Sequence, residues 1–287
     1  MDLYLHETDT DSLNLDMDYC HNQVAVSRWQ GQQQLDALDS VAAEVPVALV
    51  YNGISHVVMM CSPADLKDFA LGFSLSEGIV QRPEEIYETG LVAAEPADLS
   101  AGVEIRMAIT TQRSVQLKQR HRNLAGRTGC GLCGAQSLQH AVRPIQPVPV
   151  LPPPTPKSVE TAVQQLVDKQ PLQRLTGAFH GAAWCNSKGD IQVLREDIGR
   201  HNALDKLIGA LKTADSIIDE GFVLVSSRAS YEMVHKTSSC GISSLVAVSA
   251  PTGLALNLAK QAGLNIVGFA RPGRHVIYNQ SEMGQEK

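Results

Sequence analysis

The stretch at residues 222–249, FVLVSSRASYEMVHKTSSCGISSLVAVS, decides the fold class because it places a helical segment between two short apolar runs. The runs at 222–226 and 245–249 are typical of buried strands. A third run of this kind, at 264–270, follows another helical stretch. Strands that alternate with helices in this way predict a sheet with helices on both faces.

The residues before this stretch extend the same domain. Apolar runs at 178–185 and 191–194 flank a turn sequence at 187–190, and a helix is predicted at about 201–211. Ser158 is predicted to cap an earlier helix, because the apolar residues after it share one face: Val159, Ala162, Val163, Leu166 and Val167. The C-terminal part is therefore predicted to be an α/β domain.

The N-terminal part predicts a smaller α+β domain. Two apolar runs, at 47–51 and 54–60, are joined by Asn52-Gly53, a dipeptide that favours a tight hairpin turn. Alternating apolar residues at 103–109 predict a half-buried strand.

A helix is expected directly after the hairpin. Ser62 is its predicted N-cap, Pro63 fits its first position, and Gly78 is its predicted end. One face of this helix is apolar and is formed by Leu66, Phe69, Ala70 and Phe73.

Proline content marks the expected linker between the domains. Seven of the 14 prolines lie between Pro144 and Pro156, and such a segment is extended because proline cannot donate ladder hydrogen bonds. The predicted organisation is an acidic flexible tail at 1–20, the α+β domain at 21–125, a loop with a cysteine pair and the linker at 126–156, and the α/β domain at 157–287.

The composition is that of an ordinary globular protein. With 287 residues, of which 44% are hydrophobic and 19% charged, the chain buries enough surface to fold without disulfides or a structural metal. Its first eighteen residues are acidic and lack Lys and Arg, unlike a secretory signal, and no apolar run is long enough to span a bilayer. We therefore expect a cytoplasmic protein with reduced thiols and neither a membrane nor a nucleic-acid partner.

The cysteine pair lies in RTGCGLCG, residues 127–134, as Cys130 and Cys133. Two thiols at this spacing form a disulfide, share a metal or exchange a sulfur atom. Spacing alone leaves open half of a zinc site and a thioredoxin-like redox pair, although a second pair for zinc is missing and the glycine-rich setting is unlike that of thioredoxins.

The charge around this pair is strongly asymmetric. Residues 105–159 contain no Asp or Glu but eight Lys and Arg residues: Arg106, Arg113, Lys118, Arg120, Arg122, Arg127, Arg143 and Lys157. A solvated basic face explains this pattern equally well from charge alone. Because the two cysteines share the segment, we favour an electropositive surface that attracts an anion and stabilises the nucleophilic thiolate.

Three polar segments fall where predicted strands of the α/β domain end, at 195–202, 226–230 and 269–274. Ligands of α/β sheets bind beyond the carboxyl ends of the strands, so these segments are candidate ligand contacts. Helix capping by Asp197 and plain turns with surface arginines are the structural alternatives. The sequence contains neither a P-loop nor a GxGxxG dinucleotide motif.

Within these segments, Arg228, Arg271 and Arg274 offer donors suited to a phosphate or a guanine edge, and Gly273 lets a ligand approach the backbone. His180, in the first predicted strand of the α/β domain, is a candidate base or ligand, or else a core histidine.

With its motifs in this order, the chain resembles the formate dehydrogenase accessory sulfurtransferase family. The resemblance covers about residues 46–278. The matching runs are CGLCG at 130–134, HGAA at 180–183, EDIGRHNALDK at 196–206, SRASYEMV at 227–234 and FARPGR at 269–274.

The resemblance implies a function that spacing alone does not give. Members of the family take sulfur as a persulfide from a cysteine desulfurase and deliver it to the bis-molybdopterin guanine dinucleotide cofactor of formate dehydrogenase, so both proteins are expected partners. Cys130 would carry the persulfide and Cys133 would assist or relay it. The family also implies a cytidine deaminase-like α/β/α C-terminal domain and a homodimer.

The molybdenum cofactor would be bound as a substrate, and GDP-like ligands would mimic it. The residues implied for its binding are Phe269, Ala270, Arg271, Pro272, Gly273, Arg274, Arg228 and His180.

Zinc-dependent deamination is not expected from the implied fold. A zinc deaminase needs His-x-Glu and Pro-Cys-x-x-Cys, whereas His180 precedes Gly181-Ala182 and the cysteine pair lies upstream without a preceding proline. We therefore predict no protein-ligated zinc. Two competing functions are a molybdenum-cofactor chaperone without sulfur transfer and a thiol–disulfide oxidoreductase.

Overall fold

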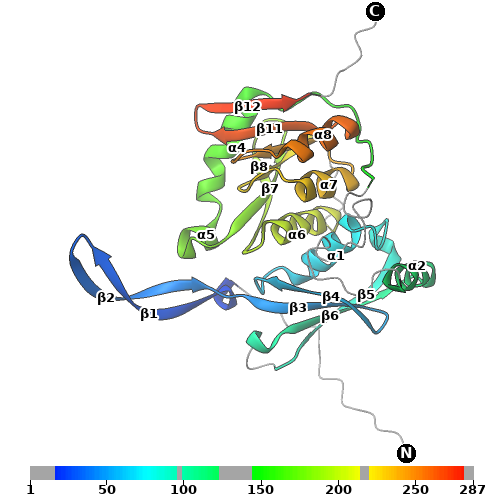
Figure 1. Ribbon diagram of the computed structural model, residues 1–287, viewed down its shortest axis with the longest axis horizontal. Coiled ribbons are helices and arrows are strands. Elements are labelled where there is room, and N and C mark those ends of the chain that lie inside the picture. Colours follow the sequence, from blue (N-terminus) through cyan, green and yellow to red (C-terminus); the bar gives the residue numbers. More distant parts are fainter. Residues whose placement is uncertain (1–16, 96–98, 123–143, 214–219, 281–287) are drawn as a thin grey trace, which may run out of the picture.

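A computed structural model describes residues 17–95, 99–122, 144–213 and 220–280, and its two larger sheets share one hydrophobic core (Figure 1). The larger sheet has six strands in the order β12-β11-β10-β9-β7-β8. Its strands are β7 (His180–Asn186), β8 (Ile191–Asp197), β9 (Gly221–Val225), β10 (Ser244–Ala247), β11 (Asn265–Arg271) and β12 (Arg274–Asn279). Strands β9, β10 and β11 are parallel, whereas β7 is antiparallel to both of its neighbours.

Helices cover both faces of the larger sheet, which confirms the predicted α/β class. On one face, Val159, Val163 and Leu166 pack against the strands from α4. Three helices that follow β8, β9 and β10 pack on the other face. The helices of this part are α4 (Pro156–Asp168), α5 (Pro171–Thr176), α6 (Arg200–Thr213), α7 (Tyr231–Ser239) and α8 (Gly253–Ala262).

The smaller sheet has four strands in the order β4-β3-β6-β5. They are β3 (Val45–Tyr51), β4 (Ile54–Cys61), β5 (Ile86–Ala93) and β6 (Val103–Ile109), accompanied by α1 (Leu66–Ser76), α2 (Thr111–Arg122) and the short turns η3 (Pro83–Glu85) and η4 (Leu99–Ala101). The predicted hairpin at Asn52-Gly53 is confirmed, since both residues have positive φ, at 47° and 77°. The predicted strand at 103–109 is β6, whose residues alternate between buried and less buried positions.

Two predicted helix caps are wrong. Helix α1 begins at Leu66, after Asp65 with a φ of 55°, and not near Ser62-Pro63. The backbone and hydroxyl of Ser62 instead donate to Asp197, because a buried carboxylate needs every donor within reach. In α4 the N-cap is Thr155, whose side chain accepts from the Ser158 amide.

The proline-rich segment at 144–155 lies along the larger sheet and its helices. The Val148 amide donates to the carbonyl of Ala262, and the side chains of Ser243 and Asn265 donate to carbonyls of Pro149 and Leu151. The segment is therefore held in place by one of its amides and by its carbonyls, which proline leaves available.

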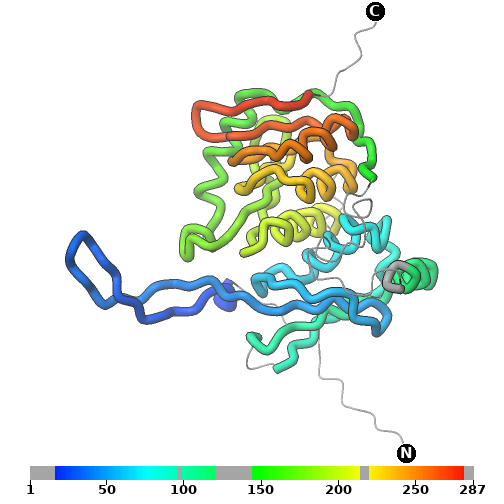
Figure 2. Tube along the Cα trace, in the orientation of Figure 1, coloured from blue at the N-terminus to red at the C-terminus, as the bar shows by residue number. Residues whose placement is uncertain are grey.

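A long two-stranded ribbon was not predicted. Strands β1 (His21–Gln30) and β2 (Gln33–Ala42) pair antiparallel over their whole length after the short turn η2 (Met17–Cys20). Figure 2 shows the ribbon reaching outward beyond the rest of the chain, with β2 leading directly into β3. Its polar glutamine-rich sequence gives no clean alternation, which is why the strand signal was weak.

The two sheets are joined by the crossing of α1 and α6. At Gly72, an added Cβ would overlap the carbonyl of Asp205, and at Gly209 it would overlap the carbonyl of Asp68. Each helix therefore presents a glycine to the backbone of the other, and this close approach excludes any side chain.

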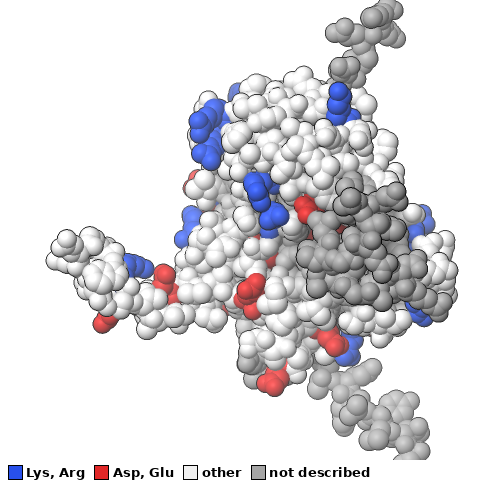
Figure 3. Space-filling view, in the orientation of Figure 1, with Lys and Arg blue, Asp and Glu red and all other residues white. Residues whose placement is uncertain are grey.

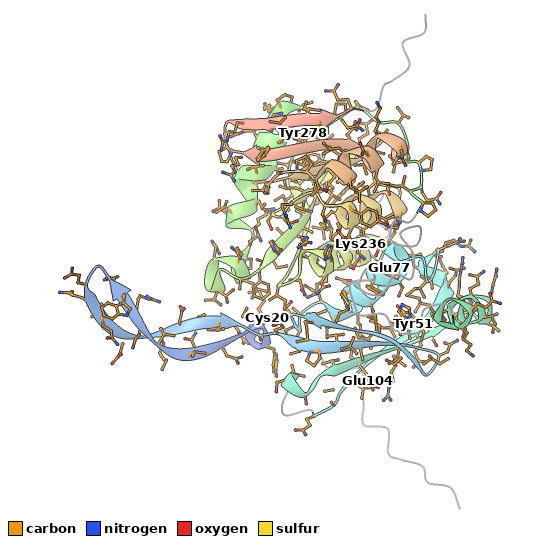
Figure 4. The ribbon with its side chains drawn as sticks, in the orientation of Figure 1. Cys20, Tyr51, Glu77, Glu104, Lys236 and Tyr278 are labelled. Atoms are coloured by element: carbon orange, nitrogen blue, oxygen red, sulfur yellow. The ribbon has the colours of Figure 1, made fainter. Side chains whose placement is uncertain are left out.

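Two buried lysines form ion pairs beside this crossing. Lys206 Nζ is 2.7 Å from Asp197 Oδ2, with both side chains fully buried. Lys236 Nζ is 3.0 Å from Asp205 Oδ2 and 2.9 Å from Glu77 Oε1, and Figure 4 shows Lys236 and Glu77 between the two halves. Although burial alone lowers the pKa of Lys236, the two carboxylates raise it above its ordinary value, so this lysine stays charged at neutral pH.

Replacing Gly72 or Gly209 with Ala should lower the free energy of unfolding by about 2 kcal/mol or more, because the methyl group collides with backbone that cannot swing away. This loss exceeds the roughly 1 kcal/mol of helix propensity that Ala gains over Gly. Chemical denaturation is the measurement. The control is Gly90→Ala, where nothing lies within 4 Å of the new methyl; equal stability of all three variants would contradict the proposed packing.

Candidate functional site

The carboxyl edge of the larger sheet collects polar residues from several elements. Because β7 is antiparallel to β9, its first residue His180 lies at the edge where the parallel strands β9, β10 and β11 end. The same edge receives the first residues of α6 and α7. Helix N-termini carry partial positive charge and free amides, so this edge favours an anionic ligand.

His180 contacts the loop after β9. Its Nδ1 lies 3.3 Å from the hydroxyl of Ser226, and that hydroxyl also accepts from the Gly181 amide at 2.9 Å. Burial lowers the pKa of His180, and the nearby charges of Arg200 and His201 lower it further. His180 is therefore neutral at pH 7 and has one nitrogen to donate and one to accept.

A second polar pair lies at the starts of α6 and α7. His201 Nε2 is 3.7 Å from Glu232 Oε2, which is an ion-pair distance and too long for a hydrogen bond. The pKa of Glu232 is lowered to about 2, first by His201 and then with help from the Ser230 hydroxyl at 2.8 Å. Arg200 Nε is buried without a hydrogen-bond partner among the residues that the structure describes.

The loop from Ser226 to Ser230 connects β9 to α7. Arg228 is exposed, whereas Ser227 and Ala229 are buried. Ala229 bridges to Pro251, and the Thr252 amide donates to the Ala229 carbonyl, so this loop is tied to the start of α8. The guanidinium of Arg228 is thus presented to solvent from a fixed backbone.

The β11–β12 hairpin lies at the same edge, three strand positions from β7, or about 14 Å at the usual strand spacing. Phe269 has a φ of 51°, interrupts the ladder with a bulge and leaves 39% of its surface exposed. Positive φ is unfavourable for an aromatic residue, and strain of this kind gathers at functional sites. Arg271 and Arg274 are exposed on either side of the turn.

Two residues of this hairpin have limited roles. Ala270 is fully buried in the core against α4, so it offers no accessible surface to a ligand. The Gly273 amide already donates to Glu160 Oε2 at 2.7 Å, which holds the turn on α4. Figure 3 shows Lys and Arg side chains scattered over the larger-sheet half and Asp and Glu mainly on the lower half.

Most of segment 195–202 is structural, but Asp197 is not the solvated helix cap of the structural alternative, because it is buried against Lys206. Asp197 accepts from the Gly199 amide at 2.8 Å and from Asn202 Nδ2 at 3.0 Å. Glu196 accepts from two amides of α5, and burial raises its pKa. Asp197 is the ladder partner of His180, and Arg200 and His201 of this segment also lie near that histidine.

The structure thus brings together a cluster formed by His180, Arg200, His201, Ser226 and Glu232, with Arg228 on the adjoining loop and the β11–β12 hairpin further along the edge. No sequence pattern indicated the bridge from Ala229 to Pro251 or the unusual backbone at Phe269. Thr252 before an apolar helical stripe was the one available signal for the start of α8, whose N-cap it is.

Cys130 and Cys133 lie outside the described residues. In the parts of the chain that the structure describes, no group of three or more His, Cys, Asp or Glu side chains is placed to hold a metal ion. Nor is any helix of those parts long and apolar enough to cross a membrane.

The other four thiols are poorly suited to reaction. Cys20, Cys61 and Cys185 are buried and Cys240 is half-buried. Burial raises the pKa of all four thiols, to about 12 for Cys185 and about 11 for Cys240. At neutral pH they are thiols and not the nucleophilic thiolates.

Comparison with known proteins finds a similar solved structure and a similar sequence. The structure, described as a formate dehydrogenase accessory protein from Desulfotalea psychrophila, superposes with a TM-score of 0.67 at 23% identity, covering 91% of this chain and 97% of that chain. The sulfur carrier protein FdhD of Cupriavidus necator is 51% identical over 258 residues, which are 90% of this chain and 88% of that protein. The model of the FdhD/NarQ family matches residues 42–284, so this chain belongs to that family and the resemblance read from its sequence is confirmed.

Native alkylation with iodoacetamide at pH 7.5 should modify two of the six cysteines, Cys130 and Cys133, because the other four are shielded and protonated. Intact-mass analysis counts the adducts, and all six should react after unfolding in guanidinium. Cys130→Ser and Cys133→Ser should each remove one native adduct. A third adduct on the native protein would show that at least one of the other four thiols is accessible and reactive.

Proposed function

We propose that this protein is a sulfur carrier for the maturation of formate dehydrogenase. The observation that carries the proposal is the 51% identity to the sulfur carrier protein FdhD of Cupriavidus necator over 90% of the chain. The anion-favouring edge of the larger sheet supports it, since the implied cargo is a negatively charged dinucleotide.

In the proposed first step, the Cys130 thiolate attacks the sulfane sulfur of a persulfide on a cysteine desulfurase. The new S–S bond gives a Cys130 persulfide, and the desulfurase cysteine leaves as a thiolate. The basic composition of residues 105–159 favours the attacking thiolate. No net oxidation takes place in this exchange.

Delivery of the sulfur as sulfide needs two electrons, which the second cysteine supplies. The Cys133 thiolate attacks the inner sulfur of the Cys130 persulfide, a Cys130–Cys133 disulfide forms, and the terminal sulfur leaves as hydrosulfide for the molybdenum centre. A dithiol reductant then restores the pair. The GCGLCG sequence suits both steps because glycine allows the two thiols to approach.

The proposed cargo is the bis-molybdopterin guanine dinucleotide cofactor, bound along the carboxyl edge of the larger sheet. The exposed ring of Phe269 offers a stacking surface for guanine, and Arg271 and Arg274 offer donors for its edge or phosphates. Arg228 and neutral His180 lie further along the edge, where an elongated dinucleotide reaches them.

The remaining expectations are part of the same proposal. They are a cytidine deaminase-like C-terminal domain, the domain boundaries given above, a cytoplasmic location, and a homodimer that works with a cysteine desulfurase and formate dehydrogenase. The mixed sheet with β7 antiparallel to both neighbours and helices on both faces supports the proposed domain type.

Incubation with cysteine desulfurase and cysteine should add one sulfur atom to the wild-type protein, measured by intact mass and removed by reductant. Cys130→Ala should lose this gain, while Cys133→Ala should keep the persulfide but fail to release hydrosulfide. Cys185→Ala is the matched control, because that thiol is buried. No sulfur gain in the wild type with an active desulfurase would favour a cofactor chaperone or a redox role instead.

GDP, as a probe for the guanine dinucleotide, should bind to the wild type, with affinity measured by calorimetry. Arg271→Ala and Arg274→Ala should each weaken binding by about tenfold or more, the usual effect of losing a charged donor to phosphate or guanine. Arg106→Ala is the control, since this exposed arginine of β6 pairs with Glu104 on the smaller sheet. Equal weakening in all three variants would contradict the proposed site.

A further inference from the structure

Helix α2 exposes one face to solvent directly before the segment that contains the cysteine pair. Its exposed residues recur at helical spacing as Gln112, Val115, Lys118 and Gln119, with Val115 at 48% exposure. We call these four residues the outer face of α2. Figure 1 shows α2 at the outer edge of the smaller-sheet half, so this face is accessible to a partner.

The inner side of α2 is fixed to the smaller-sheet half. Leu117 is buried in the main hydrophobic core. Arg113 Nε lies 3.0 Å from both carboxylate oxygens of Glu85, and the two side chains are only 9% and 14% exposed. Charge-assisted hydrogen bonds that are shielded from water are strong, so the first turn of α2 has a fixed position. The outer face is therefore presented from a rigid support.

The charge of α2 is not compensated within the helix. Its sequence, TQRSVQLKQRHR, contains four Arg and Lys residues and no Asp or Glu. Glu85 neutralises Arg113, whereas Lys118 forms no ion pair with any residue that the structure describes. In Figure 3, Lys and Arg side chains lie at the edge of the molecule where α2 is found. An uncompensated positive surface of this kind attracts an acidic partner.

The cysteine pair follows this helix closely in the chain. Cys130 is the eighth residue after Arg122, the last residue of α2. Eight residues span at most about 29 Å when fully extended, so Cys130 stays within this distance of the helix end. A specific protein interface covers about 800 Å² of each partner, which is a patch roughly 30 Å across. A protein that reaches Cys130 therefore has the outer face of α2 within its footprint.

We propose that the outer face of α2 is the docking site for the protein that hands sulfur to Cys130, and that this donor binds through an acidic surface. The proposal rests on the sulfur-carrier role proposed above and names the contact surface on this chain. Lys118 supplies the charge and Val115 the apolar contact. Gln112 and Gln119 offer hydrogen bonds on either side. Docking speeds the persulfide exchange by holding the two reacting sulfurs together.

Binding of cysteine desulfurase, measured by calorimetry at low salt, tests the docking face. Lys118→Glu should weaken binding about tenfold, because it reverses a charge that the acidic partner contacts, and added salt should shrink the difference. Gln119→Lys adds a positive charge to the same face and should tighten binding. Both side chains are exposed, so neither change disturbs the fold.

Lys188→Glu is the matched control, since it makes the same charge change on an exposed lysine in the turn between β7 and β8 of the larger sheet. This variant should bind the desulfurase as tightly as the wild type does. No binding by the wild type, or equal weakening in Lys118→Glu and Lys188→Glu, would overturn the proposal.

Sulfur loading from two donors separates docking from chemistry. Glutathione persulfide transfers its outer sulfur to the Cys130 thiolate and leaves as glutathione thiolate, without any protein contact. Lys118→Glu should load from this small donor at the wild-type rate, but about tenfold more slowly from limiting desulfurase. Equal slowing with both donors would place the effect on the thiol and overturn the docking face. A wild type that gains no sulfur from either donor, yet binds desulfurase through Lys118, would remove the sulfur-carrier proposal and leave the docking face standing.

Discussion

The buried pair between Asp197 and Lys206 is the interaction on which the rest of the structure depends. Taking two charges out of water is costly, and here the cost is offset by hydrogen bonds from Ser62, Gly199 and Asn202 to the carboxylate and from Lys206 to the Ser62 carbonyl. These partners come from the residue after β4, from the β8–α6 connection and from α6. The pair therefore fixes the smaller sheet on the larger one.

The same connection sets the functional edge. Asp197 holds the turn from which α6 begins, and the first two residues of α6 are Arg200 and His201. Their charges act on His180 across the edge, and His201 holds Glu232 ionised. A structural network and a candidate ligand site thus share one turn, with the buried charges on one side and the titratable groups on the other.

Local patterns predicted the elements whose structure depends on neighbours in the chain. The Asn52-Gly53 hairpin, β6 and α6 followed from turn chemistry and periodicity, because those signals act over a few residues. The caps assigned to Ser62 and Ser158 were wrong. The Ser62 hydroxyl donates to Asp197, which lies 135 residues away in the chain, and the N-cap of α4 is Thr155, whose hydroxyl accepts from the Ser158 amide. The β1–β2 ribbon was not predicted, because neither of its faces is fully apolar and its strands therefore lack a clear apolar–polar alternation.

The sequence by itself determined the α/β class and the family, since periodicity and motif order are properties of the chain. It also predicted which two cysteines react. Only the tertiary structure decided which polar residues meet. It assigned Asp197, Asp205, Lys206 and Lys236 to the joint between the sheets and left His180, Arg200, His201 and Glu232 at the carboxyl edge. The physical reason is that burial and charge pairing depend on contacts between distant segments, which no local pattern records.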